Sequence, residues 1–175
     1  MSAWNGSLDY APILEKGMRF VIIKATQGAD ISDSRFRENA ERARAAGLLV
    51  GAYHFFDYTS DGVAQADHFV ETVQAAGLLT DALPLAVDVE CLARYGWAEW
   101  ADTQPRLRAL VDRLYELTGR KPIIYTSKLM WRQVLGDDPT FGDLPLWVAC
   151  WRCDKPILPV GWNAWRFWQI RPYTF

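Results

Sequence analysis

Short apolar segments recur along the chain at lengths and spacings typical of β-strands. Six of them are almost continuously apolar, as strands covered on both faces are, whereas a strand with one wet face alternates apolar and polar residues. They span residues 20–26, 48–56, 83–90, 122–127, 146–151 and 165–169. This pattern predicts six buried strands and favours a parallel sheet over an antiparallel one.

Helical patterns lie between these strands. Residues 33–46 begin with Asp and Ser, which cap helices, and Gly47 follows them. Residues 61–76 repeat the arrangement, with a glycine directly after. A third segment, 104–118, carries an apolar stripe at helical spacing. Strand followed by helix, repeated, predicts an α/β fold.

Six strands with crossover helices fit either an open doubly wound sheet or most of a closed barrel, and periodicity alone does not choose between them. Both architectures place their sites at the C-terminal ends of the strands. Polar side chains stand near these ends: Lys24, His54, Asp88, Glu90, Tyr125 and Gln169. No glycine-rich phosphate loop follows any of the strands, which removes the main support for nucleotide binding.

Length and charge narrow the function classes. A chain of 175 residues, half of them hydrophobic, suits one domain that spans residues 1–175. The formal net charge of −2 and the interleaving of basic with acidic residues give no positive field for a nucleic acid. No apolar run approaches the ~20 residues that a membrane span needs. We therefore expect no nucleic-acid or membrane binding and no obligate protein partner.

Cysteine and aromatic content bear on the substrate class. Cys150 and Cys153 form a single C-x-x-C without the second pair that a structural zinc site requires. We interpret them, with Cys91, as buried free thiols and expect no metal and no cofactor. The nine Trp and seven Tyr can fill a core, but Trp also stacks on sugar rings and offers a donor at its edge. Carbohydrate is the substrate class that this composition favours.

Two acidic residues end the third predicted strand, in the run Leu85-Ala86-Val87-Asp88-Val89-Glu90. Residues two apart in a strand face the same side with Cα atoms roughly 6.5 Å apart, so Asp88 and Glu90 point into one space. Repulsion and partial burial would raise at least one pKa, leaving a carboxylic acid that can donate a proton near neutral pH. Glycosidic bond cleavage needs such an acid. Alternatively, both acids pair with nearby Lys or Arg, or lie at an exposed strand end.

Several stretches, in order along almost the whole chain, together resemble one family. They are Phe20-Val21-Ile22-Ile23-Lys24-Ala25-Thr26-Gln27-Gly28, Gly51-Ala52-Tyr53-His54-Phe55, Asp88-Val89-Glu90, Ile124-Tyr125-Thr126, Leu146-Trp147-Val148-Ala149 and Trp168-Gln169, with Ser2-Ala3-Trp4-Asn5-Gly6 near the start. Each piece is short, but six in register make a specific set. The sequence resembles the Chalaropsis-type lysozymes, glycoside hydrolase family 25.

This resemblance implies an irregular TIM-like (β/α) barrel and an N-acetylmuramidase. Such an enzyme cuts the β-1,4 bond between N-acetylmuramic acid and N-acetylglucosamine in bacterial peptidoglycan. By the family pattern, Glu90 is the general acid that protonates the leaving oxygen. Asp88 orients or polarises the 2-acetamido group of the muramic sugar, which acts as an internal nucleophile in place of a protein carboxylate.

The same resemblance implies a substrate-binding set: Lys24, Tyr53, Phe55, Tyr125, Trp147 and Gln169. Tyr53, Tyr125 and Trp147 would line the sugar site, although each of them also suits a core position. Lys24 faces the acids from a strand end and either tunes them electrostatically or neutralises one. His54 alternates to the opposite face from Tyr53, so we interpret it as a hydrogen-bonded structural histidine.

The family pattern extends beyond this sequence at both ends. Family members begin with a strand reading Gly-Ile-Asp-Val-Ser, whose Val corresponds to Met1 here, and they continue past Phe175 into a last strand with another active-site Asp. The comparison implies a barrel that is incomplete at both termini and lacks two of four pocket acids. We therefore expect impaired activity, or an inactive fragment, and association through exposed sheet edges.

Two other functions fit the same residues. A non-catalytic glycan-binding barrel would hold peptidoglycan without cleaving it, and its binding would survive loss of Glu90. A chitin-cleaving enzyme also uses a substrate-assisted D-x-E. It is disfavoured because residues 83–87, before Asp88, are apolar and lack the alternating acids expected there. For the lysozyme interpretation, peptidoglycan is the expected partner, and an extracellular or phage-encoded lysin is the expected setting.

Overall fold

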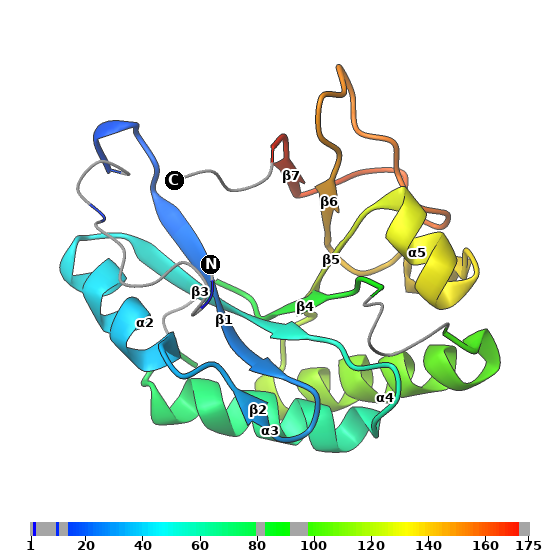
Figure 1. Ribbon diagram of the computed structural model, residues 1–175, viewed down its shortest axis with the longest axis horizontal. Coiled ribbons are helices and arrows are strands. Elements are labelled where there is room, and N and C mark those ends of the chain that lie inside the picture. Colours follow the sequence, from blue (N-terminus) through cyan, green and yellow to red (C-terminus); the bar gives the residue numbers. More distant parts are fainter. Residues whose placement is uncertain (1, 3–9, 11–13, 80–82, 92–97, 172–175) are drawn as a thin grey trace.

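The computed structural model describes residues 2, 10, 14–79, 83–91 and 98–171. Of the motif at residues 2–6, only Ser2 is among them. The described elements are β1 (Phe20–Gln27), β2 (Ile31–Ser32), α2 (Phe36–Ala45), β3 (Leu49–Phe55), α3 (Gly62–Ala75), β4 (Ala86–Asp88), α4 (Trp100–Thr118), β5 (Ile123–Thr126), α5 (Lys128–Leu135), the 3-10 helix η3 (Pro139–Phe141), β6 (Leu146–Ala149) and β7 (Phe167–Gln169) (Figure 1). Each of the six predicted strands and three predicted helices overlaps one of them.

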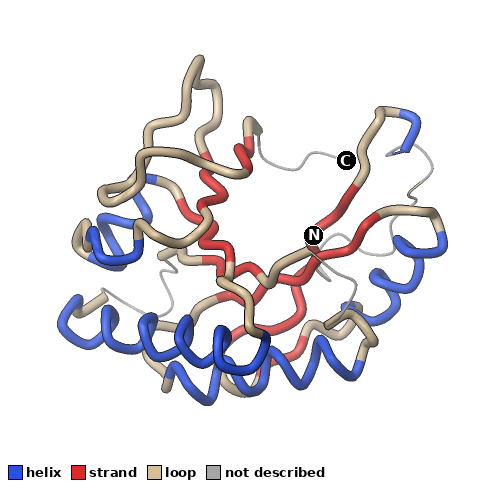
Figure 2. Tube along the Cα trace, turned by 180° about the vertical axis from the view of Figure 1, so that it is seen from behind, coloured by secondary structure: helices blue, strands red, loops and turns tan. Residues whose placement is uncertain are grey.

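The strands form one curled sheet in the order β2-β1-β3-β4-β5-β6-β7. Every neighbouring pair is parallel except β1 with β2, so the predicted parallel α/β sheet is confirmed. From β1 onward the order follows the sequence without reversal, and the helices lie outside the curve (Figures 1 and 2). A doubly wound sheet would reverse its order and carry helices on both faces, so this alternative is excluded. The described strands form an open sheet.

Alternation along the strands sorts apolar side chains into two clusters. The larger cluster fills the space between the sheet and the helices. The smaller one lies on the concave face, where Ile22, Ala86 and Ile123 are buried. Gly51 belongs to this crowded layer, because a Cβ there would stand 3.3 Å from Ile22 Cγ1. The concave face is therefore packed at its base, and the polar side chains stand above this base.

Three described elements were absent from the sequence-based assignment: helix α5, strand β2 and the 3-10 helix η3. Helix α5 has ordinary end signals, because the Ser127 side chain accepts from the Met130 N–H and Gly136 ends the helix in the left-handed conformation. Its length of 8 residues falls below what periodicity detects with ease. Strand β2 has only 2 residues and returns antiparallel along the end of β1.

The cysteine interpretation needs a correction. Cys150 and Cys153 are joined by a disulfide on the segment after β6, and Cys153 is only half-buried, so they are not buried free thiols. A three-residue separation allows this bond because a tight turn brings the two Cα atoms to 5.9 Å. Cys91 is a free, half-buried thiol. Among the described residues, no helix is long and apolar enough to cross a membrane, and no cluster of three metal-binding side chains occurs.

Candidate active site

The two acids stand where β4 ends. Asp88 is the last residue of the strand and faces the concave side, two residues after the inward-facing Ala86. Glu90 follows two residues later, just past the strand. The backbone here is held from both sides, because Phe56 N–H donates to Asp88 O at 2.9 Å and Val89 N–H donates to Tyr125 O at 2.9 Å. Asp88 is buried and Glu90 is half-buried.

The electrostatics of this pair differ from those of surface carboxylates. Burial, followed by repulsion from Glu90, raises the pKa of Asp88 well above its ordinary value, while Lys24 opposes this shift. Burial also raises the pKa of Glu90. Asp88 Oδ1 is buried and accepts no hydrogen bond from the described part of the chain. The site therefore holds at least one proton more readily than free carboxyls do, and it presents an acceptor that a bound ligand can fill.

Lys24 approaches the acids from β1. Its Nζ donates to Gln27 Oε1 at 2.7 Å and stands 5.2 Å from the centre of the Phe55 ring. Phe55 ends β3 in register with Asp88. The ammonium group therefore acts on Asp88 through space, because its positive charge favours the ionised carboxyl.

Aromatic and amide side chains continue the concave face toward β7. Tyr125 is in register with Asp88 on one side and with Trp147 on the other. Its ring meets the Trp147 ring edge-on with centroids 4.6 Å apart, and its hydroxyl donates to Gln169 Oε1 at 2.7 Å. Tyr53 and Trp147 also pack against the small concave cluster. The structure thus brings the six residues predicted to bind substrate to one face, where Tyr53 and Trp147 also contribute to the packing.

His54 lies on the other face of β3, as the alternation predicted. Its ring is fully buried, with Nδ1 2.8 Å from Thr26 Oγ1 and Nε2 2.9 Å from Gln65 Oε1. Burial lowers the pKa of His54 to about 4. A neutral, hydrogen-bonded imidazole beneath the sheet holds β1 and β3 against α3, which confirms the structural interpretation.

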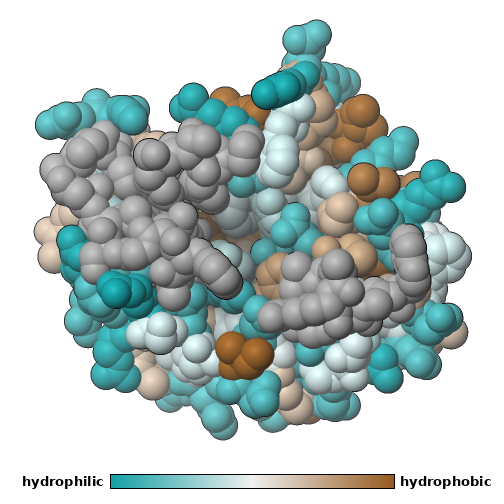
Figure 3. Space-filling view, in the orientation of Figure 1, coloured by the Kyte–Doolittle hydropathy of each residue, from teal (hydrophilic) through white to brown (hydrophobic). Residues whose placement is uncertain are grey.

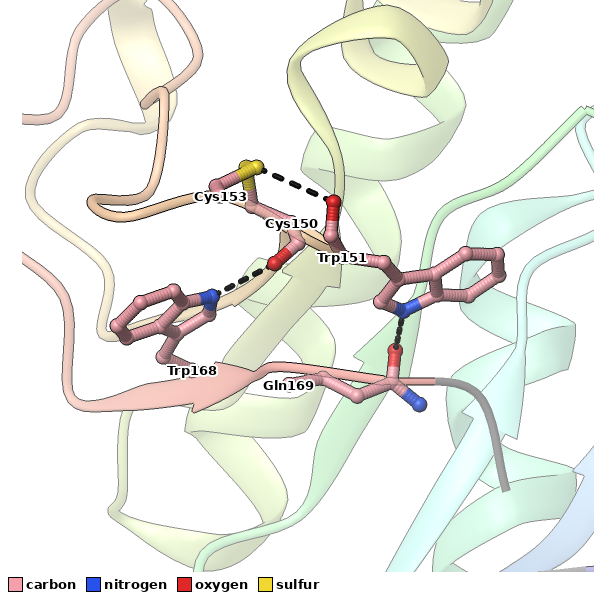
Figure 4. Close-up of a disulfide and its surroundings, with 5 residues drawn as sticks. All are labelled: Cys150, Trp151, Cys153, Trp168 and Gln169. Carbon is pink, nitrogen blue, oxygen red and sulfur yellow. Dashed lines mark hydrogen bonds between the residues drawn. A yellow bond between two sulfur atoms is a disulfide. The ribbon is translucent and has the colours of Figure 1, made fainter. Parts of the chain in front are cut away.

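Sequence reasoning did not select Trp151, which the structure places beside this set. Its indole Nε1–H donates to Gln169 Oε1 at 3.1 Å, next to the Cys150–Cys153 disulfide (Figure 4). The sequence carried two signals for it, the C-x-x-C that encloses it and its place at the end of a predicted strand. Neither signal indicates on its own which way the side chain points.

Comparisons with known proteins agree on one family. The family model described as glycosyl hydrolases family 25 matches residues 1–173. Lysozyme M1 of Streptomyces globisporus is 33% identical over 174 residues, covering 97% of this chain and 59% of the relative. The N,O-diacetylmuramidase of Chalaropsis sp is 30% identical over 186 residues, covering 97% of this chain and 84% of the relative.

Solved structures give the same result. A family GH25 lysozyme from Aspergillus fumigatus superposes with a TM-score of 0.88 at 30% identity, covering 97% of this chain and 84% of that one. The bacterial lysozyme from Streptomyces coelicolor gives a TM-score of 0.87 at 32% identity, with coverages of 97% and 81%. The chain spans 59% of the length of Lysozyme M1 and 84% of the length of the Chalaropsis enzyme. The expectation of an inactive fragment finds no support in these comparisons and stays a prediction.

Proposed function

The chain belongs to glycosyl hydrolases family 25, and on this premise we propose that it is an N-acetylmuramidase. It hydrolyses the β-1,4 bond between N-acetylmuramic acid and N-acetylglucosamine in bacterial peptidoglycan. The observation that carries the proposal is the acid pair at the end of β4, whose two pKa values are both raised. In this proposal the open curled sheet is an irregular (β/α) barrel that is incomplete in the described residues.

Glu90 is the proposed general acid. Burial raises its pKa, so a larger fraction keeps its proton near neutral pH than for an exposed glutamate. That proton passes to the glycosidic oxygen as the bond to C1 breaks. The resulting carboxylate then accepts a proton from the water that attacks C1, which returns Glu90 to its starting state.

Asp88 is proposed to hold the 2-acetamido group of the muramic sugar. Its Oδ1 has no hydrogen-bond donor within the described chain, so the acetamido N–H can fill this position. The hydrogen bond favours the charged form of Asp88, and the charged Asp88 in turn favours a proton on Glu90. The acetamido oxygen, turned toward C1, supplies the electron pair that displaces the leaving sugar, so no protein nucleophile is needed.

The remaining residues surround the sugar in this proposal. Tyr125 and Trp147 form an aromatic wall on one side, and Gln169 stands beside them. Lys24 and Phe55 face the acids from the other side, above Tyr53. Amphipathic aromatic walls suit pyranose rings, which have apolar faces and polar edges.

Cleavage of purified peptidoglycan tests the proposal. The wild-type protein should release reducing sugars, and Glu90→Gln should lower the rate by about 10²-fold or more because it removes the proton donor. Glu71→Gln is the matched control, because Glu71 is an exposed glutamate on α3. Equal rates for wild type and Glu90→Gln would contradict the proposed role of Glu90.

The identity of the new reducing end separates the candidate activities. Borohydride reduction of the products should convert muramic acid to muramitol if the enzyme is a muramidase. Glucosaminitol in its place would contradict this specificity. Release from chitin oligomers at a rate comparable with peptidoglycan would favour the chitin-cleaving alternative. Binding to peptidoglycan without any cleavage would favour the glycan-binding alternative.

A further inference from the structure

The segment after β6 is fastened to the rim of the concave face. The Cys150–Cys153 disulfide closes a four-residue ring around Trp151 and Arg152. Arg152 adopts a φ of 57°, one of two non-glycine residues with positive φ in the described chain. Such a backbone is sparsely populated, so the surrounding bonds have to hold it in place. The disulfide is one of these bonds, and it thereby fixes the direction in which Trp151 leaves the backbone.

Trp151 points to the same side of β7 as the proposed site. Gln169 and Trp168 alternate along β7, and Trp168 packs against the large outer cluster and donates to Cys150 O at 2.9 Å. Gln169 faces the other way, and the Trp151 indole reaches it there (Figure 4). The two indoles therefore hold the segment from opposite sides, and Trp151 is the one on the concave side.

A shared hydrogen-bond acceptor connects Trp151 to the proposed site. Gln169 Oε1 accepts from Trp151 Nε1 at 3.1 Å and from Tyr125 Oη at 2.7 Å. An indole N–H only donates, so the atom it meets has to be the amide oxygen. The amide nitrogen consequently faces away from Trp151, as Figure 4 shows. Its two protons can be donated to a ligand on the concave face.

The Trp151 ring is exposed although its N–H is satisfied. Its exposed fraction is 51%, which is high for a side chain of this size held in place by a hydrogen bond and a disulfide-bounded turn. Ile157 and Val160, between β6 and β7, and Ile170, directly after β7, are exposed as well. In the space-filling view, brown apolar residues also gather at the upper right (Figure 3).

We propose that Trp151 stacks on a sugar ring of the glycan strand adjacent to the ring bound at Asp88 and Glu90, with Gln169 Nε2 donating to that sugar and the Cys150–Cys153 disulfide positioning both. This inference rests on the proposed function, since it extends the same substrate along the rim. Tyr125 lies beside Asp88, and the Gln169 amide oxygen accepts from both Tyr125 and Trp151. Two side chains therefore stand between the acids and Trp151, and we assign its contact to the neighbouring sugar.

Binding to defined glycans tests the inference apart from catalysis. Two soluble ligands are titrated calorimetrically into a Glu90→Gln background, where turnover is suppressed: N-acetylmuramic acid alone, and a longer oligomer of four alternating N-acetylglucosamine and N-acetylmuramic acid sugars that also contains the neighbouring ring. Trp151→Ala should weaken binding of the longer oligomer by about tenfold, the scale of one aromatic contact. It should weaken binding of the single sugar less. Trp151→Phe should restore most of the loss, because it keeps the apolar face.

A matched control separates this effect from general damage. Trp100 is 50% exposed and donates its indole N–H to Gln133 O at 3.0 Å, but it packs against Gly136 in the helical layer. Trp100→Ala should leave both affinities unchanged. Equal losses for the single sugar and the oligomer in Trp151→Ala, or equal losses for Trp100→Ala and Trp151→Ala, would overturn the inference.

The role of the disulfide has its own readout. Replacing both Cys150 and Cys153 by Ser should weaken binding of the long oligomer in the same direction as Trp151→Ala. Combining the changes should add little to the effect of Trp151→Ala alone, because the bridge acts through Trp151. Fully additive losses would overturn the positioning role.

The wild-type protein then tells the two proposals apart. Loss of affinity in Trp151→Ala, with no peptidoglycan cleavage by wild type, would contradict the muramidase proposal and leave the sugar contact standing. If wild type cleaves peptidoglycan and Trp151→Ala leaves the affinity for the longer oligomer unchanged, the muramidase proposal stands and the Trp151 sugar contact is overturned.

Discussion

Replacing Asp88 by Asn should stabilise the fold at neutral pH while it removes activity. Asp88 is buried, lies beside Glu90, and has an oxygen without a hydrogen bond in the described chain. Its pKa is therefore raised in the folded state, which binds a proton more tightly than the unfolded chain does. Folding stability then falls as pH rises from the unfolded pKa toward the folded one. Asparagine has nearly the same shape and carries no charge to desolvate.

The size of the gain follows from this desolvation. Leaving a buried polar group unsatisfied costs about 1–3 kcal/mol, and more for a charged one, so we expect Asp88→Asn to gain about 1 kcal/mol or more at pH 7.5. For a domain of this size, each kcal/mol corresponds to a rise of roughly 2–4 °C in Tm. The gain should shrink as pH falls toward 4, because Asp88 is then protonated in the folded state and no longer carries a buried charge.

Thermal denaturation of wild type and Asp88→Asn between pH 4 and 8 measures this difference in Tm. Glu71→Gln, at an exposed position, is the control and should have the same Tm as wild type. Peptidoglycan cleavage by Asp88→Asn is followed in parallel and should be lost. A Tm below wild type at pH 7.5, or a Tm difference that does not change with pH, would refute the reasoning about the buried carboxylate.

Three further predictions concern pH and packing. Because the pKa of His54 is lowered to about 4, its contribution to stability is complete above pH 6.5 and falls by about 3 kcal/mol as pH drops to 4. His54→Gln should therefore be less stable at pH 7 by chemical denaturation, with a gap to wild type that narrows at pH 4; a constant gap would contradict this. Because burial raises the pKa of Glu90, the alkaline limb of the cleavage rate should lie above the pKa of an ordinary glutamate, and a limb near 4.5 would contradict it. Gly62→Ala should cost about 3 kcal/mol or more in urea unfolding, because its Cβ would stand 2.0 Å from Arg106 O on α4. Gly47→Ala, where a Cβ meets nothing within 4 Å, should cost only about 1 kcal/mol of backbone strain, and equal losses would contradict the packing argument.

Much of the candidate site could be predicted because strand alternation is a local rule. Asp88 and Glu90 share a side whatever the strand pairs with, and His54 takes the face opposite Tyr53 for the same reason. The residues at which strands end were harder to predict. The third strand was expected to reach residue 90, but its ladder ends at Asp88 because strand length depends on the partner strands.

The cysteine pair shows where local reasoning stops. A lone C-x-x-C is compatible with thiols, a metal ligand pair or a disulfide, and composition favoured the first. The outcome depended on the turn after β6, where Arg152 adopts a positive φ. That conformation is stabilised by contacts with β7, 18 residues further along the chain, which no pattern around Cys150 contains.

The sequence by itself determined the positions of the six parallel strands, the three longer helices, the shared side of Asp88 and Glu90, and the family; the expected burial fails for β7, whose three residues are all half-buried. All of these depend on residue periodicity and on motifs read along a short stretch of chain. Only the tertiary structure decided how the sheet curls, how far Asp88 is desolvated, and that Tyr125, Gln169 and Trp151 share one hydrogen-bonded oxygen. These features arise between segments 18 to 44 residues apart, whose relative positions are set by strand register and helix packing.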